Sequence, residues 1–268
     1  MKYEDVPKAK MVILKLLIEK YKENPCTTLS TAFWKILKPL SELETSIISD
    51  QNEIKKIIIK NGSQLLLYWQ KFDSNDIDLT INVYKLNFFV IHNRYYNFIK
   101  SAQKIKLQKY FRLIYRFEKL PKQFLPQGFH FQTVDTIKDL QLVCSILKEC
   151  YPGSLFTESV IKSWTFHPVF NPHLWIWILD SNNSKVALGI AEEDKIIPEA
   201  SLEWIQVLPS YRKKGLGKAL VYELLHRVKN NVPFVTVSGL QSNDSNPEQL
   251  YRSCGFTGSD IWLVFKRD

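Results

Sequence analysis

The segment Ser201-Leu-Glu-Trp-Ile-Gln-Val-Leu-Pro-Ser-Tyr-Arg-Lys-Lys-Gly-Leu-Gly-Lys218 decides how the rest of this sequence is interpreted. A strand predicted over 200–208 runs into Pro209, and a helix is predicted over 217–229. Between them lies a basic turn with two glycines, Gly215 and Gly217. A strand, a glycine turn and a helix in this order form a structure that can hold a ligand at the start of the helix.

The glycines and cations of this turn suit a phosphate or pyrophosphate group. Glycine permits conformations that expose backbone amides, and these amides lie at a helix N-terminus, where the dipole also favours an anion. Four cations add positive charge: Arg212, Lys213, Lys214 and Lys218. The spacing is neither that of a P-loop nor that of the dinucleotide-binding GxGxxG turn. A solvated basic turn that merely precedes a helix is the alternative interpretation.

The elements predicted after residue 128 indicate an α+β fold with a mixed sheet. Strands are expected over 129–134, 173–179, 185–191, 200–208, 233–238 and 260–266, and helices over 136–150, 157–166, 217–229 and 246–253. Hairpins alternate with one βαβ unit in this order, so parallel and antiparallel pairs should occur in one sheet.

The first 120 residues form a less regular α/β module. We expect a helix over 9–22, a helix over 51–60 capped by Asp50, strands over 64–72 and 79–91, and a long basic helix over 94–118. Residues 121–128 contain Pro121, Pro126 and Gly128 and are interpreted as a linker. The predicted division is therefore a module over 1–120, a linker over 121–128 and a domain over 129–268.

The chain of 268 residues carries 36 Lys and Arg against 27 Asp and Glu, a formal net charge of +9. Residues 1–120 hold 21 basic and 12 acidic side chains, and residues 121–268 hold 15 of each. The whole excess thus belongs to the first module. Binding of nucleic acid through the basic 94–118 segment is one explanation. A solvated helix whose aromatic residues face the core is the interpretation we favour.

Several classes of protein are disfavoured by what the sequence lacks. The N-terminus has acidic residues where a signal peptide has a basic start and an apolar stretch, and no apolar run is long enough to span a bilayer. Four scattered cysteines and five scattered histidines fit neither a zinc site nor a disulfide framework. We therefore expect a cytoplasmic protein with free thiols, no metal and no membrane partner.

Two motifs resemble the signatures of the GCN5-related N-acetyltransferase (GNAT) family. In Val207-x-Pro-x-Tyr-Arg-Lys-Lys-Gly-Leu-Gly-Lys218, Arg212, Gly215 and Gly217 stand at the family's R/Q-x-x-G-x-G/A positions. The run Asn246-Pro-Glu-Gln-Leu-Tyr-Arg-Ser-Cys-Gly-Phe256 resembles the second signature, although the usual alanine after Asn246 is missing. The resemblance covers about 129–268 and implies the acyl-CoA N-acyltransferase fold with acetyl-CoA as cosubstrate.

The resemblance also implies where acetyl-CoA binds. In the family, two central strands part, and the pantetheine arm of the coenzyme pairs with the backbone of one of them. In this sequence that strand edge corresponds to residues 205–207. A bulge near Gln206 is expected to separate it from the strand at 234–238. The pyrophosphate then lies over the turn. The implied binding residues are Ile205, Gln206, Val207, Arg212, Lys213, Lys214, Gly215, Leu216, Gly217, Lys218 and Asn246.

The reaction implied is transfer of an acetyl group to a primary amine by direct attack. Glu203, placed in the apolar Leu-Glu-Trp-Ile context, is the candidate general base, and a glutamate at the strand edge bonded to solvent or a neighbour is the alternative. Tyr251 matches the family's tyrosine and is the candidate acid that protonates the departing thiolate. Cys254 nearby is interpreted as a packed thiol.

The acceptor is expected opposite the coenzyme, against residues 151–166 and possible contacts from 238–244. Tyr151, Phe156, Trp164 and Phe166 form either an aromatic wall of that site or part of the core. A small amine, a peptide N-terminus and a lysine side chain all stay open as acceptors. The competing functions are a nucleic-acid-binding protein and a coenzyme A sensor with an acetyltransferase-like domain and no turnover.

Overall fold

The protein is described from a computed structural model, which covers residues 2–50, 53–71, 85–98, 106–151, 155–242 and 245–267. The chain packs as two compact units. Unit 1 comprises Met1–Leu113, Ser238–Glu248 and Gly258–Asp268, and unit 2 comprises Ile114–Val237 and Gln249–Thr257. Residues 238–248 and 258–268 thus pack with the N-terminal residues. The expected division at 121–128 stays a prediction.

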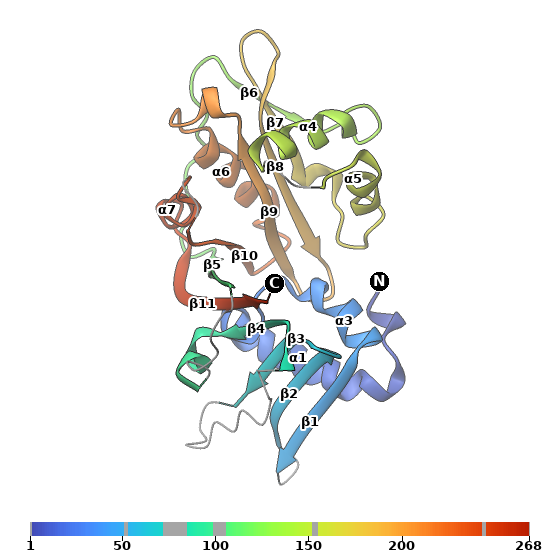
Figure 1. Ribbon diagram of the computed structural model, residues 1–268. Coiled ribbons are helices and arrows are strands. Elements are labelled where there is room, and N and C mark those ends of the chain that lie inside the picture. The colour runs from blue at the N-terminus through green and yellow to red at the C-terminus, as the bar shows by residue number, and fades with distance from the viewer. Residues whose placement is uncertain are drawn as a thin grey trace. The chain divides into compact units, whose positions relative to one another are not determined.

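Unit 2 is built on a mixed sheet, as the sequence predicts. Its strands run in the order β10-β9-β8-β7-β6 (Figure 1), with bounds Phe234–Leu240, Glu199–Val207, Lys185–Asp194, Trp175–Leu179 and His130–Thr133. The pairs β6–β7, β7–β8 and β8–β9 are antiparallel, and β9–β10 is parallel. The parallel pair arises because the chain crosses over through helix α6 between β9 and β10.

Helices cover both faces of this sheet. On one face lie α4 (Leu140–Cys150) and α5 (Glu158–Trp164), and on the other lies α6 (Leu216–Val228) (Figure 1). The predicted cap of α5 is confirmed, because the Val160 N–H donates to Thr157 Oγ1 at 3.2 Å. The apolar stripe of α4 packs against the alternate strand residues Trp175 and Trp177 in one buried cluster.

Close packing of α6 on the sheet depends on Gly189 of β8. A Cβ atom at this position would lie 3.1 Å from Leu220 Cδ2 and 3.3 Å from Leu224 Cδ1, both on α6. The missing side chain therefore lets the helix approach the strand. This contact helps to fix the position of α6 and of the site at its N-terminus.

Unit 1 contains a second set of strands that pair in the order β1-β2-β3-β4-β11-β5. Their bounds are Glu44–Asp50, Glu53–Asn61, Gln64–Gln70, Phe88–His92, Thr257–Lys266 and Lys106–Arg116. The α-helices are α1 (Met11–Glu23), α2 (Pro25–Thr28) and α3 (Leu37–Glu42). The first helix and the strand over 64–72 are thus confirmed, and β4 is the described part of the strand predicted over 79–91, whose residues 79–84 lie outside the described range.

The helix predicted over 51–60 is wrong, because residues 53–61 form strand β2. Alternate residues Ile57 and Ile59 are fully buried, which is the period of a strand with one face in the core. The β-branched isoleucines that fill this stretch also favour extended backbone. The prediction gave too much weight to the capping potential of Asp50.

The long basic helix predicted over 94–118 is also wrong in its described part. Residues 93–98 form a 3₁₀ turn and residues 106–116 form β5, while 99–105 lie outside the described residues. Phe111, Leu113 and Tyr115 are buried at a spacing of two. The cations of 106–116 are therefore spread over two faces of a strand and do not form one helical stripe.

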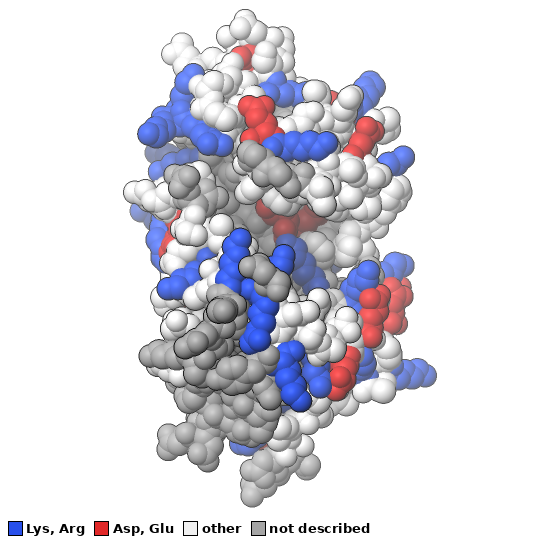
Figure 2. Space-filling model, in the orientation of Figure 1, with Lys and Arg blue, Asp and Glu red and all other residues white. Residues whose placement is uncertain are grey.

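Some of the lysines of unit 1 are paired with carboxylates. Lys20 pairs with Glu23, Lys60 with Glu44, and Lys55 with Glu53. Lys and Arg side chains lie beside Asp and Glu side chains in several places on the visible face of the molecule (Figure 2). The two signs of charge are thus interspersed locally, while the net excess of unit 1 is unchanged.

Candidate functional site

Strands β9 and β10 part halfway along β9. Their parallel register runs from Glu199 opposite Phe234 to Leu202 opposite Val237. On its other edge β9 stays paired with β8 as far as Val207, with one extra residue, Glu203, inserted between the pairs at Leu202 and Trp204. This bulge lies at Glu203 and not at Gln206, where we expected it. A bulge bends its strand, so the 203–207 segment diverges from β10 where the bulge begins.

Divergence leaves one backbone edge of β9 facing away from β8. The Leu208 N–H donates to the Val186 carbonyl on the β8 side at 3.0 Å. Because backbone groups alternate along a strand, the N–H groups of Ile205 and Val207 point to the opposite edge. That edge can pair with an extended ligand as a further strand would.

Residues after β9 form the turn into α6 with two unusual backbone conformations. Pro209–Tyr211 is a single 3₁₀ turn, Lys213 has φ of +59°, and Gly215 has φ of +83°. Gly215 is the N-cap of α6 and carries no side chain that could bond the amides of the first helical turn. These amides are therefore available to an anion from outside the helix, and the helix dipole favours it.

Gly217 has a different task from Gly215. A Cβ atom on Gly217 would lie 3.2 Å from Leu250 Cδ2 of α7 (Pro247–Ser253) and 3.9 Å from Val207 Cγ2 of β9. The glycine lets the start of α6 approach both elements. Packing thus explains the second glycine of the motif, and the left-handed backbone explains the first. Leu216 between them is buried and anchors the first turn of the helix.

Two contacts hold the turn against the sheet. Arg212 Nε donates to the Val207 carbonyl at 3.1 Å, so this cation both carries charge and fixes the end of β9. The Tyr211 hydroxyl donates to Asp180 Oδ2 at 2.8 Å. Lys214 Nζ lies 4.8 Å from the centre of the Tyr211 ring. Lys213 and Lys214 are exposed, so the turn presents positive charge to solvent.

Tyr251 lies on α7 and is buried. Its ring packs edge-on against Phe256 at 5.7 Å. Burial raises the pKa of its phenol, and Tyr151, Cys254 and Glu203 nearby raise this pKa further. The hydroxyl of Tyr251 therefore keeps its proton throughout the physiological range, so this proton is available to a departing group.

Glu203, the bulged residue, is half-buried, and Ser201 Oγ donates to its Oε1 at 2.8 Å. The bulge therefore determines both where β9 leaves β10 and where this carboxylate is held. Since Glu203 contributes to the pKa of Tyr251, the two candidate catalytic groups lie in one electrostatic neighbourhood. Their roles stay predictions.

Aromatic side chains gather around Trp204, which the sequence analysis did not single out. Trp164 stacks on Trp204 at 5.9 Å, and Tyr151 and Phe156 meet it edge-on at 5.5 Å and 5.3 Å. Gln206 Nε2, two residues along the strand, donates to the Tyr151 hydroxyl at 3.2 Å. Phe166, considered for either this wall or the core, is 76% exposed. In the sequence, the one indication that Trp204 belongs to this site is that it directly follows the candidate base Glu203.

Asn246 precedes α7 and has φ of +47°. Asparagine tolerates this left-handed conformation better than most residues, so its place at the helix start has a backbone reason as well as the ligand role implied by the resemblance. Cys254 is buried, and burial raises the pKa of its thiol to about 11, as expected of a packed thiol.

The described residues were also searched for a metal site and for a membrane-spanning helix. Within them, no group of three His, Cys, Asp or Glu side chains is arranged to hold a metal ion. Likewise, none of the helices in this part of the chain is both long and apolar enough to cross a membrane.

A mixed sheet whose parallel pair parts at a bulge, followed by a glycine turn into a helix, is the arrangement of the acyl-CoA N-acyltransferase fold. Residues 172–258 match the family model described as an acetyltransferase (GNAT) domain. This part of the chain is therefore a GNAT domain, and the fold expected from the sequence is confirmed.

Solved structures share the fold at low sequence identity. A GCN5-related N-acetyltransferase from Sphaerobacter thermophilus is 12% identical in sequence and has a TM-score of 0.67. The match covers 87% of this chain and 84% of that protein's chain. A GNAT-family acetyltransferase from Colwellia psychrerythraea is 11% identical and has a TM-score of 0.56, and the match covers 84% of this chain and 86% of that one. A tandem GNAT protein from the clavulanic acid biosynthesis pathway is 10% identical and has a TM-score of 0.50, and the match covers 82% of this chain and 80% of that one. None of the curated proteins matches the sequence.

Proposed function

We propose that this protein is an acetyl-CoA-dependent N-acetyltransferase that transfers the acetyl group to a primary amine. The observation that carries the proposal is the divergence of β9 from β10 at Glu203, directly before a left-handed glycine turn that opens α6. An exposed strand edge and an uncapped helix N-terminus in succession suit a ligand with an amide-containing arm and a pyrophosphate.

The residues that would hold acetyl-CoA follow from this arrangement. Ile205 and Val207 present backbone groups at the edge for the pantetheine arm, with the Gln206 backbone between them. The pyrophosphate would lie over the amides and cations of 212–218. When bound, acetyl-CoA supplies a thioester whose carbonyl carbon accepts the nucleophile. The Val207 N–H is the nearest edge donor to the turn and is proposed to polarise that carbonyl.

Transfer requires a proton to leave the amine and another to reach the departing sulfur. The amine nitrogen forms a bond to the acetyl carbon, the carbon–sulfur bond breaks, and the electron pair of that bond stays on sulfur. Glu203 accepts the amine proton, directly or through a water. Tyr251, which burial keeps protonated, donates its proton to the thiolate and regains one from solvent.

The acceptor is proposed to be a small-molecule or peptide amine on the side of β9 covered by α4 and α5. Trp204 and Gln206 point their side chains towards Tyr151 on that side. An aromatic surface with a few polar groups suits an acceptor with an apolar portion next to its amine. For residues 1–120 the proposal keeps two roles, a lid or a degenerate second copy of the fold.

Nucleic-acid binding loses its structural basis in the described residues. It rested on one basic helical face over 94–118, and residues 106–116 of that segment are a strand. A coenzyme A sensor without turnover differs from the enzyme only in the reaction step. The two are separated by whether bound acetyl-CoA is consumed when an amine is added.

Hydrogen exchange in the full chain tests where the cosubstrate binds. With saturating acetyl-CoA, amides in the 203–207 segment should exchange more slowly, because the edge N–H groups gain hydrogen-bond partners. Strand β7 should show no change and serves as the internal reference. Binding measured by calorimetry with unchanged exchange at 203–207 would place the ligand elsewhere and contradict the proposed site.

A further inference from the structure

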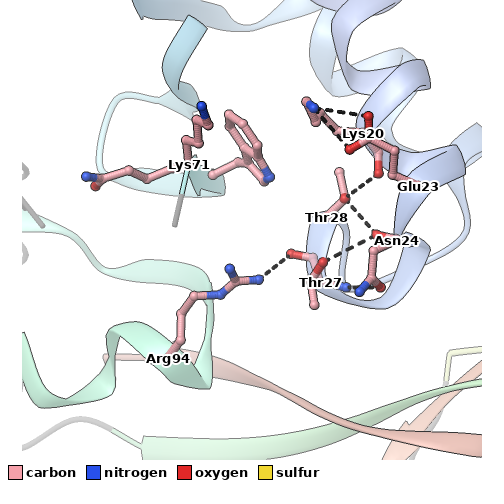
Figure 3. A pocket seen from close by; sticks show the side chains of 9 residues that line it. Lys20, Glu23, Asn24, Thr27, Thr28, Lys71 and Arg94 are labelled. Carbon is pink, nitrogen blue, oxygen red and sulfur yellow. Dashed lines mark hydrogen bonds and ion pairs between the residues drawn. The ribbon is translucent and has the colours of Figure 1, made fainter. Parts of the chain in front are cut away.

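A polar cleft of about 320 Å³ lies in unit 1, and none of its lining residues is assigned to acetyl transfer. Its walls come from the end of α1, from α2, from the end of β3 and from the turn after β4 (Figure 3). The lining residues are Lys20, Glu23, Asn24, Thr27, Thr28, Trp69, Gln70, Lys71 and Arg94. This volume suits a small molecule.

Positive charge predominates in the cleft. Lys20, Lys71 and Arg94 face a single carboxylate, Glu23. Lys20 Nζ pairs with Glu23 at 3.0 Å, and Lys71 pairs with Glu53 outside the lining. The carboxylate partners are 62% and 48% exposed, and ion pairs of this kind contribute little. An anion that enters competes with these carboxylates for the two lysines, and the competition is stronger at Lys71, since Lys55 and Lys71 together lower the pKa of Glu53 to about 2.

Arg94 is held much more firmly than the lysines. Its backbone N–H and its Nε both donate to His92 Nδ1, at 3.2 Å and 3.1 Å, and its Nη2 donates to the Thr27 carbonyl at 3.1 Å. Figure 3 shows the Arg94 side chain reaching towards Thr27 across the cleft. The guanidinium plane is thus fixed before any ligand arrives, which lowers the entropy lost on binding.

His92, which is buried, and Asp260, which is half-buried, set the position of Arg94. Because His92 Nδ1 accepts from two N–H donors, its proton is on Nε2, which donates to Asp260 Oδ1 at 3.0 Å. His92 also meets Trp262 edge-on at 5.2 Å. Burial lowers the pKa of His92, which keeps Nδ1 available as an acceptor. His92 and Asp260 therefore act as positioning residues for Arg94.

Trp69 gives the cleft an apolar wall. Trp69 is 8% exposed, and it lines the cleft together with Lys20 and Arg94. This small apolar surface beside fixed and mobile cations suits the edge of a flat apolar group attached to an anionic group.

We propose that this cleft binds a small molecule that joins an oxyanion, carboxylate or phosphate, to a flat apolar group. The oxyanion lies against Arg94 with Lys20 and Lys71 on either side, and the flat group lies against Trp69. The site is independent of the acetyltransferase proposal, since it shares no residue with it.

The test uses the full chain and follows the ¹⁵N–¹H signal of the Trp69 indole, assigned with Trp69→Phe. Phenyl phosphate and benzoate are the two oxyanion probes, and benzyl alcohol is the uncharged probe. At least one oxyanion should shift the signal saturably, with a Kd of about 1 mM or below. The oxyanion that binds more tightly identifies the class. Equal binding of benzyl alcohol, or no saturation with either oxyanion, would overturn the proposal.

Variants assign the binding to the named residues. Arg94→Gln should weaken oxyanion binding by about tenfold or more, because a charge-assisted hydrogen bond is lost. Lys71→Gln should weaken it by a smaller factor and serves as a second variant should Arg94→Gln fail to fold. Lys38→Gln, an exposed lysine of α3 outside the cleft, should leave the Kd unchanged. Equal losses in Lys38→Gln and Arg94→Gln would contradict the site.

A further pair of variants tests the positioning role of His92. His92→Asn keeps an acceptor for Arg94 and should retain most of the affinity, whereas His92→Leu should lose about as much affinity as Arg94→Gln. If both variants fold and bind equally well, the positioning role is wrong.

Discussion

Replacing Tyr251 by phenylalanine is expected to lower kcat by about 10²–10⁴-fold, the range for loss of a positioned acid or base. The affinity for acetyl-CoA should hardly change, because the ring and its edge-on contact with Phe256 are kept. In the proposed mechanism the variant lacks the proton that is donated to the departing sulfur. Since burial raises the pKa of this phenol, wild-type kcat should not fall through loss of its proton between pH 7 and about 10.

A matched control for this prediction is Tyr115→Phe. Tyr115 is also buried, packs against the same Phe256 at 5.4 Å, and donates its hydroxyl proton to the Lys119 carbonyl. Loss of that hydroxyl should cost some stability and leave kcat unchanged. A kcat for Tyr251→Phe within twofold of wild type, with the fold intact, would remove Tyr251 from the mechanism.

Reversing the charge of Lys214 is expected to weaken acetyl-CoA binding by about ten- to a hundredfold, as measured by calorimetry at low salt. Lys214 is exposed at the turn before α6, and a carboxylate there would repel the pyrophosphate. The loss should shrink as ionic strength rises, because exposed charges are screened. Lys214 is preferred to Arg212 for this charge reversal, because Arg212 Nε also donates to the Val207 carbonyl and its replacement would disturb the end of β9.

Lys195→Glu is the matched control for that charge reversal. Lys195 is exposed in the turn between β8 and β9, at the opposite end of β9 from the glycine turn. The same change in net charge should leave acetyl-CoA affinity within about twofold of wild type. Equal losses in both variants would indicate a general effect of net charge and would contradict an anion site at 212–218.

The GNAT domain was predictable from sequence because its signals are local. Strand–turn–helix order, the two glycines and the cap at Thr157 each depend on neighbouring residues, and the structure bears out the mixed sheet they predict. The bulge at Glu203 was not predictable in position, since it depends on how β9 pairs with β8 and β10 at once. Trp204 was missed because its partners come from α4 and α5, far away in sequence.

The N-terminal module shows where the sequence analysis fails. In 53–61 and 106–116, apolar residues at mixed spacings suit a helix and a strand equally, and pairing with distant strands decides between them. The Asp260–His92–Arg94 chain likewise joins β11 to β4 and the turn after it across most of the sequence. No local motif signals such an arrangement.

Release of coenzyme A, followed with a thiol reagent during incubation of the full chain with acetyl-CoA and a panel of amines, tests the proposed acetyl transfer most directly. The panel contains small primary amines, a peptide with a free N-terminus, and an N-terminally blocked peptide with one lysine. We expect amine-dependent release with at least one class, acetylation of that amine by mass spectrometry, and loss of both in Tyr251→Phe. Saturable binding of acetyl-CoA without transfer to any class would contradict the enzyme and leave a coenzyme A sensor.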